Sequence, residues 1–182
     1  MRFHKILVAI DDSPLCPSIF TTGLELAQSS QATLLLVHCL NPERVSESTV
    51  PMMFEAGMAL EIGEEYRTQQ ILIDKQMEEA RVLLKRYCEE AISQGVSAEF
   101  GCRVGEAGDQ LCETAREWEA DLIVVGRRGR KGWAEAFLGS VSNYVVHHAP
   151  CSVLVIQDAK LDPMLQQNRE IPHPQQTDFP SL

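Results

Sequence analysis

Three continuous runs of apolar residues, separated by segments with a helical pattern, dominate the sequence. The runs are Lys5–Ile10, Thr33–Cys39 and Leu122–Val125. Apolar strands without polar alternation are typical of sheets that are covered on both faces, which is the usual state of parallel sheets. The first two runs and the segment between them form a β-α-β pattern, which favours a right-handed parallel crossover. The runs therefore predict an α/β fold.

Helix signals lie between the apolar runs. Ser13 is a predicted N-cap and Pro14 the first helical residue, with the helix closing at Ser29–Ser30. A second helix ends near Gly95 and has an apolar stripe at four-three-four-three-four spacing. The stripe consists of Ile73, Met77, Ala80, Leu84, Tyr87 and Ala91.

The second half of the chain continues the alternation. The pattern of 96–104 predicts a half-covered edge strand, and 105–119 an amphipathic helix with Leu111, Ala115 and Trp118 facing inward. A further helix is expected over Ser140–His148, followed by a last strand over Val153–Ile156. Five strands and four helices predict a single open, doubly wound parallel sheet with helices on both faces.

The length of 182 residues favours one domain. We predict a domain over 1–157, with a long connection over 41–70 after the second strand. Within that connection, the Met-rich piece from Met52 to Leu60 is expected either to pack as a short helix or to form an exposed partner surface. The segment 158–182 contains four prolines and few apolar residues, and we expect it to be a mobile tail.

Composition excludes several classes of protein. The formal net charge of −10 argues against a nucleic-acid partner, because phosphate backbones bind basic surfaces. Six widely spaced cysteines without a Cys-x-x-Cys pair resemble core residues of a reducing compartment more than a zinc site. The apolar run after Lys5 is too short for a signal peptide, and no segment is long enough to cross a bilayer. We expect a cytoplasmic protein with no membrane partner.

A glycine-rich basic loop follows the central apolar run. The loop contains Gly126 and Gly129, and Gly139–Ser140 follows after nine further residues, where Ser140 is expected to cap a helix. Glycines beside a helix N-terminus present peptide N–H groups that suit phosphate. Cations reinforce this interpretation, namely Arg127, Arg128, Arg130 and Lys131. The alternative is a solvated turn between a strand and a helix.

Asp11 ends the first strand, as Gly126 ends the central one. Ligands of open α/β sheets bind outside the carboxyl ends of the strands, where the strand order reverses. If these two strands flank that point, Asp11 faces the loop and suits a sugar hydroxyl, a base amine or a metal-bound phosphate. The alternative is that Asp11 or Asp12 only caps the following helix.

The motif Gly126-x-x-Gly129, nine residues, Gly139–Ser140 is similar to the nucleotide-binding motif of the universal stress protein family. The opening Lys5–Ser13 and the ending Ser140–Ile156 also resemble that family. The resemblance covers about residues 2–157, apart from the connection. It implies strand order 3-2-1-4-5, as in adenine nucleotide α-hydrolase-like folds. It also implies a homodimer that binds ATP or AMP, with or without Mg²⁺, and that acts in stress adaptation.

The loop chemistry and the resemblance together give the candidate cofactor-binding residues: Ala9, Ile10, Asp11, Ser13, Cys39, Val125, Gly126, Arg127, Arg128, Gly129, Gly139, Ser140 and Val141. By resemblance, Ala9 and Cys39 border adenine, and Asp11 meets the ribose or a magnesium ion. Cys39 departs from the branched aliphatic residue that is common in the family, and Arg128 from a frequent histidine.

The resemblance also assigns the remaining roles. Val125 and Gly126 lie near the ribose, and the phosphates are held by backbone groups of Gly129, Gly139, Ser140 and Val141. The strand Val153–Ile156 pairs with its mate in a second chain, which removes an exposed edge.

Sequence support for catalysis is small. The loop lacks a Walker lysine before Ser or Thr, and no Gly-x-Ser-x-Gly elbow is present. We therefore expect a nucleotide-binding sensor or adaptor with an unknown protein partner. The alternatives are a weak ATPase, an adenylating α/β enzyme, or a structural dimer without nucleotide.

Overall fold

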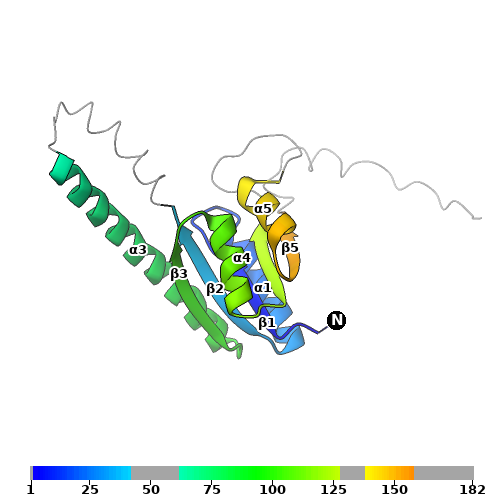
Figure 1. The fold of residues 1–182 in the computed structure, drawn as a ribbon. Helices are drawn as coiled ribbons and strands as arrows, with labels where there is room; N and C mark the ends of the chain where they lie inside the picture. Colours follow the sequence, from blue (N-terminus) through cyan, green and yellow to red (C-terminus); the bar gives the residue numbers. More distant parts are fainter. Residues whose placement is uncertain (1, 42–61, 128–137, 158–182) are drawn as a thin grey trace, which may run out of the picture.

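The computed structural model describes residues 2–41, 62–127 and 138–157, and every structural statement below refers to these residues. Five strands and four helices alternate along them (Figure 1). The strands are β1 (Lys5–Ala9), β2 (Thr33–Leu40), β3 (Ala98–Val104), β4 (Leu122–Gly126) and β5 (Ser152–Ile156). The helices are α1 (Cys16–Ser30), α3 (Ile62–Ser93), α4 (Ala107–Glu117) and α5 (Ser140–His148).

The strands form one parallel sheet in the order β3-β2-β1-β4-β5. This order and the α/β class confirm the prediction. The register pairs Leu7 of β1 with Leu35 of β2 on one side and with Ile123 of β4 on the other. Because these central strands are covered on both faces, their side chains are almost all buried, as the continuous apolar runs predicted.

The core consists of two layers, one on each face of the sheet. Helices α1 and α3 cover one face, where Phe20, Leu24 and Leu84 pack with Leu36. Helices α4 and α5 cover the other face, where Leu111 and Val145 are among the residues that pack against the sheet. Figure 1 shows α4 and α1 on opposite faces. No helix in these segments has the length and apolar character needed to span a membrane.

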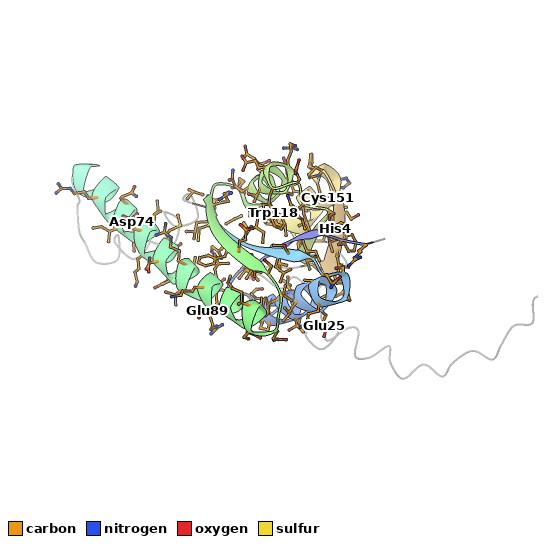
Figure 2. All side chains as sticks on the ribbon, turned by 90° about the horizontal axis from the view of Figure 1, so that it is seen from below. His4, Glu25, Asp74, Glu89, Trp118 and Cys151 are labelled. Atoms are coloured by element: carbon orange, nitrogen blue, oxygen red, sulfur yellow. The ribbon has the colours of Figure 1, made fainter. Side chains whose placement is uncertain are left out.

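Helix α3 is longer than the sequence pattern indicated. It begins at Ile62, so 62–70 belongs to this helix, whereas the connection was expected to extend over 41–70. Its final turns pack on the sheet, but its first half extends beyond it, where Asp74 is labelled (Figure 2). Ile73 and Met77 of the predicted stripe are accordingly only partly buried. Gly95 closes the helix with a φ of +81°. The Met-rich piece and the tail lie outside the described residues.

The predicted cap of α1 is wrong. The helix begins at Cys16 with Leu15 at the N-cap position, and no side chain caps it. Ser13 instead donates hydrogen bonds to Asp11, through its backbone N–H (3.0 Å) and its hydroxyl (2.6 Å). This Asx-type turn is a local alternative to a helix cap for short polar side chains. The chain thereby leaves β1 through a tight turn before α1 starts.

Candidate functional site

A cleft of about 150 Å³ lies at the carboxyl ends of β1 and β4. These two strands are neighbours in the sheet but not in the sequence, so the strand order reverses between them. Open α/β sheets bind ligands at this place. The described lining residues are Ala9, Ile10, Asp11, Ile19, Val37, Cys39, Ala107, Leu111, Val125, Gly126, Arg127, Gly139, Ser140, Val141 and Ser142.

The cleft brings together most of the residues that the sequence singled out. Three of the predicted residues are exceptions. Ser13 is buried and does not line the cleft, because its hydroxyl is turned toward Asp11. Arg128 and Gly129 lie outside the described residues, as do Arg130 and Lys131. The loop is therefore represented in the cleft by its two ends, at Gly126–Arg127 and at Gly139–Val141.

The carboxylate of Asp11 faces the cleft with one oxygen already bound. Its Oδ1 atom accepts both hydrogen bonds from Ser13. Among the described residues Oδ2 has no hydrogen-bond partner. Asp11 thus shapes the turn before α1 and also lines the cleft. The alternative that Asp11 or Asp12 caps α1 is wrong, because no side chain caps this helix. A single carboxylate oxygen suits Mg²⁺ that is held mainly by phosphates and water.

The N-terminus of α5 supplies donors to the cleft that have no partner among the residues the structure describes. Gly139 is the N-cap residue in an extended conformation (φ −61°, ψ 161°), and no side chain caps the helix. This corrects the expectation that Ser140 caps it, since Ser140 is the first helical residue. The first intrahelical bond joins the Asn143 N–H to the Gly139 carbonyl at 2.9 Å. The N–H groups of Ser140, Val141 and Ser142 precede it and lack intrahelical partners.

A buried serine fixes this helix end to the end of β4. The side chain of Ser142 is 1% exposed, and its Oγ lies 3.1 Å from the carbonyl oxygens of both Arg127 and Gly139. The Arg127 carbonyl also accepts the Gly139 N–H at 2.7 Å. These bonds close the base of the loop, so the unpaired amides of α5 are held at a set position beside Gly126.

The end of β2 contributes a free peptide edge. The Leu34 N–H bonds the Ser97 carbonyl, and the Leu40 carbonyl accepts the Gly105 N–H, so the even-numbered residues of β2 bond toward β3. The odd-numbered residues therefore face β1, where the last ladder bond joins the Ile10 N–H to the Val37 carbonyl at 2.8 Å. The next peptide groups of this edge, the N–H and C=O of Cys39, have no backbone partner among the described residues.

The side chain of Cys39 lies in an apolar part of the cleft. Burial raises the pKa of its thiol from 9.0 to about 12, although the nearby Arg103 guanidinium acts in the opposite direction. Cys39 is therefore a neutral, weakly nucleophilic group at physiological pH. No group of three potential metal ligands occurs in the part of the chain that the structure describes.

Five lining residues were not predicted as site residues: Ile19, Val37, Ala107, Leu111 and Ser142. The apolar ones look like core residues in the sequence, and only the fold shows that they border a cavity. Ser142 had a sequence signal, because a serine in the first turn after Gly139–Ser140 is well placed to bond the preceding chain.

The topology and the cleft define a class of protein, namely an open parallel α/β sheet with a cleft at its switch point. The Universal stress protein family model matches residues 2–157. The chain belongs to this family.

Individual relatives agree with this assignment. The chain is 38% identical over 159 residues to the universal stress protein Sll1388 of Synechocystis sp., a match that covers 86% of this chain and 99% of the relative. The universal stress protein UspA from Lactobacillus plantarum has a similar structure, with a TM-score of 0.70, 24% identity, and coverage of 86% of this chain and 99% of that one. An Arabidopsis thaliana family member with AMP bound has a TM-score of 0.54 and 21% identity, covering 88% and 96%.

Proposed function

We propose that the cleft binds an adenine nucleotide, ATP or AMP, and that the protein acts as a dimeric stress-response sensor or adaptor. The observation that carries the proposal is the group of unpaired α5 amides beside the end of β4, with the Asp11 carboxylate in the same cleft. The AMP-bound structure of the Arabidopsis thaliana relative supports it. The glycine spacing of the sequence, which is similar to that of the nucleotide-binding members, also supports the proposal.

The phosphates bind at the N-terminus of α5. Peptide N–H groups of Ser140 and Val141 donate to phosphate oxygens, and the helix dipole favours the negative charge. Arg127 lines the same part of the cleft and adds a positive charge. Gly129 and Arg128 join this set on the evidence of the sequence alone.

The base binds against the end of β2. The side chains of Ala9, Val37 and Leu111 give this part of the cleft an apolar lining. The N–H and C=O of Cys39, which have no backbone partner in the described segments, are one donor and one acceptor in adjacent positions. Adenine presents a ring nitrogen acceptor beside an amino donor, so the two edges are complementary. The cleft of about 150 Å³ is smaller than the 300–1,000 Å³ of typical ligand sites, so it encloses only part of a nucleotide.

Asp11 lies between these two parts. Its Oδ2 accepts a ribose hydroxyl or binds a magnesium ion that the phosphates hold. We assign it no catalytic role, because a carboxylate that positions a ligand is not a water-activating base. Occupancy of the cleft changes the surface that the dimer presents to a protein partner, which is how a binding protein without turnover transmits a signal.

The dimer forms through β5. Within the described part of the chain this strand pairs only with β4, and its residues from Val153 to Ile156 are half-buried. Exposed edges of this kind are usually paired or blocked. Pairing with β5 of a second chain satisfies the outward peptide groups and covers the half-exposed side chains.

Calorimetric titration with ATP, AMP and a cyclic dinucleotide tests nucleotide binding. We expect heat with ATP or AMP and no turnover at enzyme-like rates. Phosphate release at such rates would favour an enzyme, and no heat with any of the three would favour a structural dimer.

A charge variant locates the phosphates. Ser140→Asp places a carboxylate in the first turn of α5, which stabilises the helix but repels phosphate. We expect ATP affinity to fall about tenfold or more, equivalent to about 1.4 kcal/mol. Asn143→Asp adds the same charge on the exposed side of α5 and should change affinity much less. Equal effects of the two variants would contradict this placement of the phosphates.

A further inference from the structure

His38 is a buried polar residue that lies behind the cleft wall. It is 7% exposed and belongs to β2, next to Cys39. Its Nδ1 lies 2.9 Å from the carbonyl oxygen of Ile10. A carbonyl oxygen only accepts hydrogen bonds, so Nδ1 carries the hydrogen in this contact.

The His38 side chain bonds a backbone carbonyl that would otherwise accept the next hydrogen bond of the sheet. In the ladder between β1 and β2, the Ile10 N–H bonds the Val37 carbonyl. The next bond of a parallel ladder would join the Cys39 N–H to the Ile10 carbonyl. That bond is not made in the described part of the chain, and the Ile10 carbonyl accepts from the His38 ring. The sheet therefore stops pairing one step early, and the Cys39 N–H stays free.

We propose that His38 is a positioning residue for base recognition, which keeps the Cys39 peptide open by binding the Ile10 carbonyl. This inference rests on the proposed nucleotide function and extends it to a residue that does not line the cleft. A buried carbonyl without a donor is unfavourable by roughly 1–3 kcal/mol. Without the imidazole, the Ile10 carbonyl therefore takes the Cys39 N–H, which extends the ladder and removes the base's donor.

Two variants of nearly equal size separate hydrogen bonding from packing. Leucine and asparagine have the same branched shape, but only asparagine has an N–H group near the position of Nδ1. His38→Leu removes the donor to Ile10, and His38→Asn keeps it. Both replace the ring with a smaller group, so their loss of packing is similar.

The readout is the ratio of affinities for AMP and inosine 5′-monophosphate, measured by calorimetry. The two ligands share ribose and phosphate, and they differ in the donor and acceptor pattern of the base edge. We expect the wild type to prefer AMP. In His38→Leu the affinity ratio should fall at least about tenfold, and in His38→Asn it should stay close to the wild-type ratio. An unchanged ratio in His38→Leu, or an equal loss in both variants, would overturn the proposal.

Amide hydrogen exchange tests the inference independently of binding. In the nucleotide-free protein we expect fast exchange of the Cys39 amide in the wild type and in His38→Asn, and slow exchange in His38→Leu. Fast exchange in all three would refute the role of His38. If the wild type bound neither nucleotide while the exchange pattern held, the proposed function would fail and the account of His38 would stand.

Discussion

The hydroxyl of Ser142 lies 3.1 Å from the carbonyl oxygen of Arg127, and this contact joins the first turn of α5 to the end of β4. The same carbonyl also accepts the Gly139 N–H, so removing the Ser142 hydroxyl does not leave this carbonyl without a hydrogen bond. Ser142→Ala should therefore lower the free energy of unfolding by only about 1 kcal/mol. It should weaken ATP binding several-fold, since the α5 amides lose their fixed position. Asn143→Ala, on the exposed face, is the control, and an equal loss of affinity there would contradict this role.

A side chain added at Gly126 would have to displace the ends of two buried side chains where β4 meets α1. An added β-carbon would lie 2.8 Å from Cδ1 of Ile19 and 2.9 Å from Cδ2 of Leu15. Gly126→Ala should therefore lower the free energy of unfolding by about 1–3 kcal/mol, as overpacking does. In Gly101→Ala the new β-carbon would meet only the Arg103 side chain, at 3.5 Å, so little change is expected. Denaturant unfolding of the two variants provides the test, and equal stabilities would contradict it.

Asp121 fixes the start of β1 at the end of the sheet opposite the cleft. Its Oδ2 accepts the N–H groups of His4 (2.6 Å) and Lys5 (3.0 Å). Asp121→Ala should be destabilising by about 2–3 kcal/mol, because both bonds to a charged acceptor disappear. Asp121→Asn keeps an acceptor and should have a smaller effect. Glu25→Ala on the exposed face of α1 is the control for thermal unfolding, and a neutral Asp121→Ala would refute this account.

An outward-facing N–H group of β5 can be removed by substitution without breaking the hydrogen bonds to β4. The Ser152 N–H and the Ile156 carbonyl bond to β4, so the backbone of Val153 and Val155 faces the free edge. Val155→Pro deletes one outward N–H and should convert the proposed dimer to a folded monomer, as judged by analytical ultracentrifugation. Leu154→Pro breaks the ladder to β4 and should unfold the protein instead. A dimer that persists in folded Val155→Pro would exclude pairing through this edge.

The sequence predicts the fold well because its evidence is local. The apolar runs that become β1, β2 and β4 are continuous, and the Gly126 and Gly139–Ser140 spacing marks the loop between β4 and α5. The lining of the cleft was predictable for residues at strand ends, such as Asp11 and Cys39. It was not predictable for Val37 or Leu111, and neither was the place of His38 behind the cleft wall, because these positions depend on which strands become neighbours. The cap of α1 was wrong because Ser13 had two partners available, and the bond to Asp11 formed rather than a helix cap.

The thiol of Cys39 makes stability depend on alkaline pH. Burial raises its pKa from 9.0 to about 12 in the folded state, so the unfolded chain ionises first. Above pH 9 the unfolded state binds fewer protons than the folded state, and the free energy of unfolding falls as the pH rises toward 12. One such group contributes up to about 1.4 kcal/mol for each pH unit. Cys39→Ala should flatten the fall between pH 9 and 10.5, measured by urea unfolding under reducing conditions. Ser29→Ala, which removes no titrating group, should leave the slope unchanged, and an identical slope in Cys39→Ala would show that this thiol does not stay neutral in the folded protein.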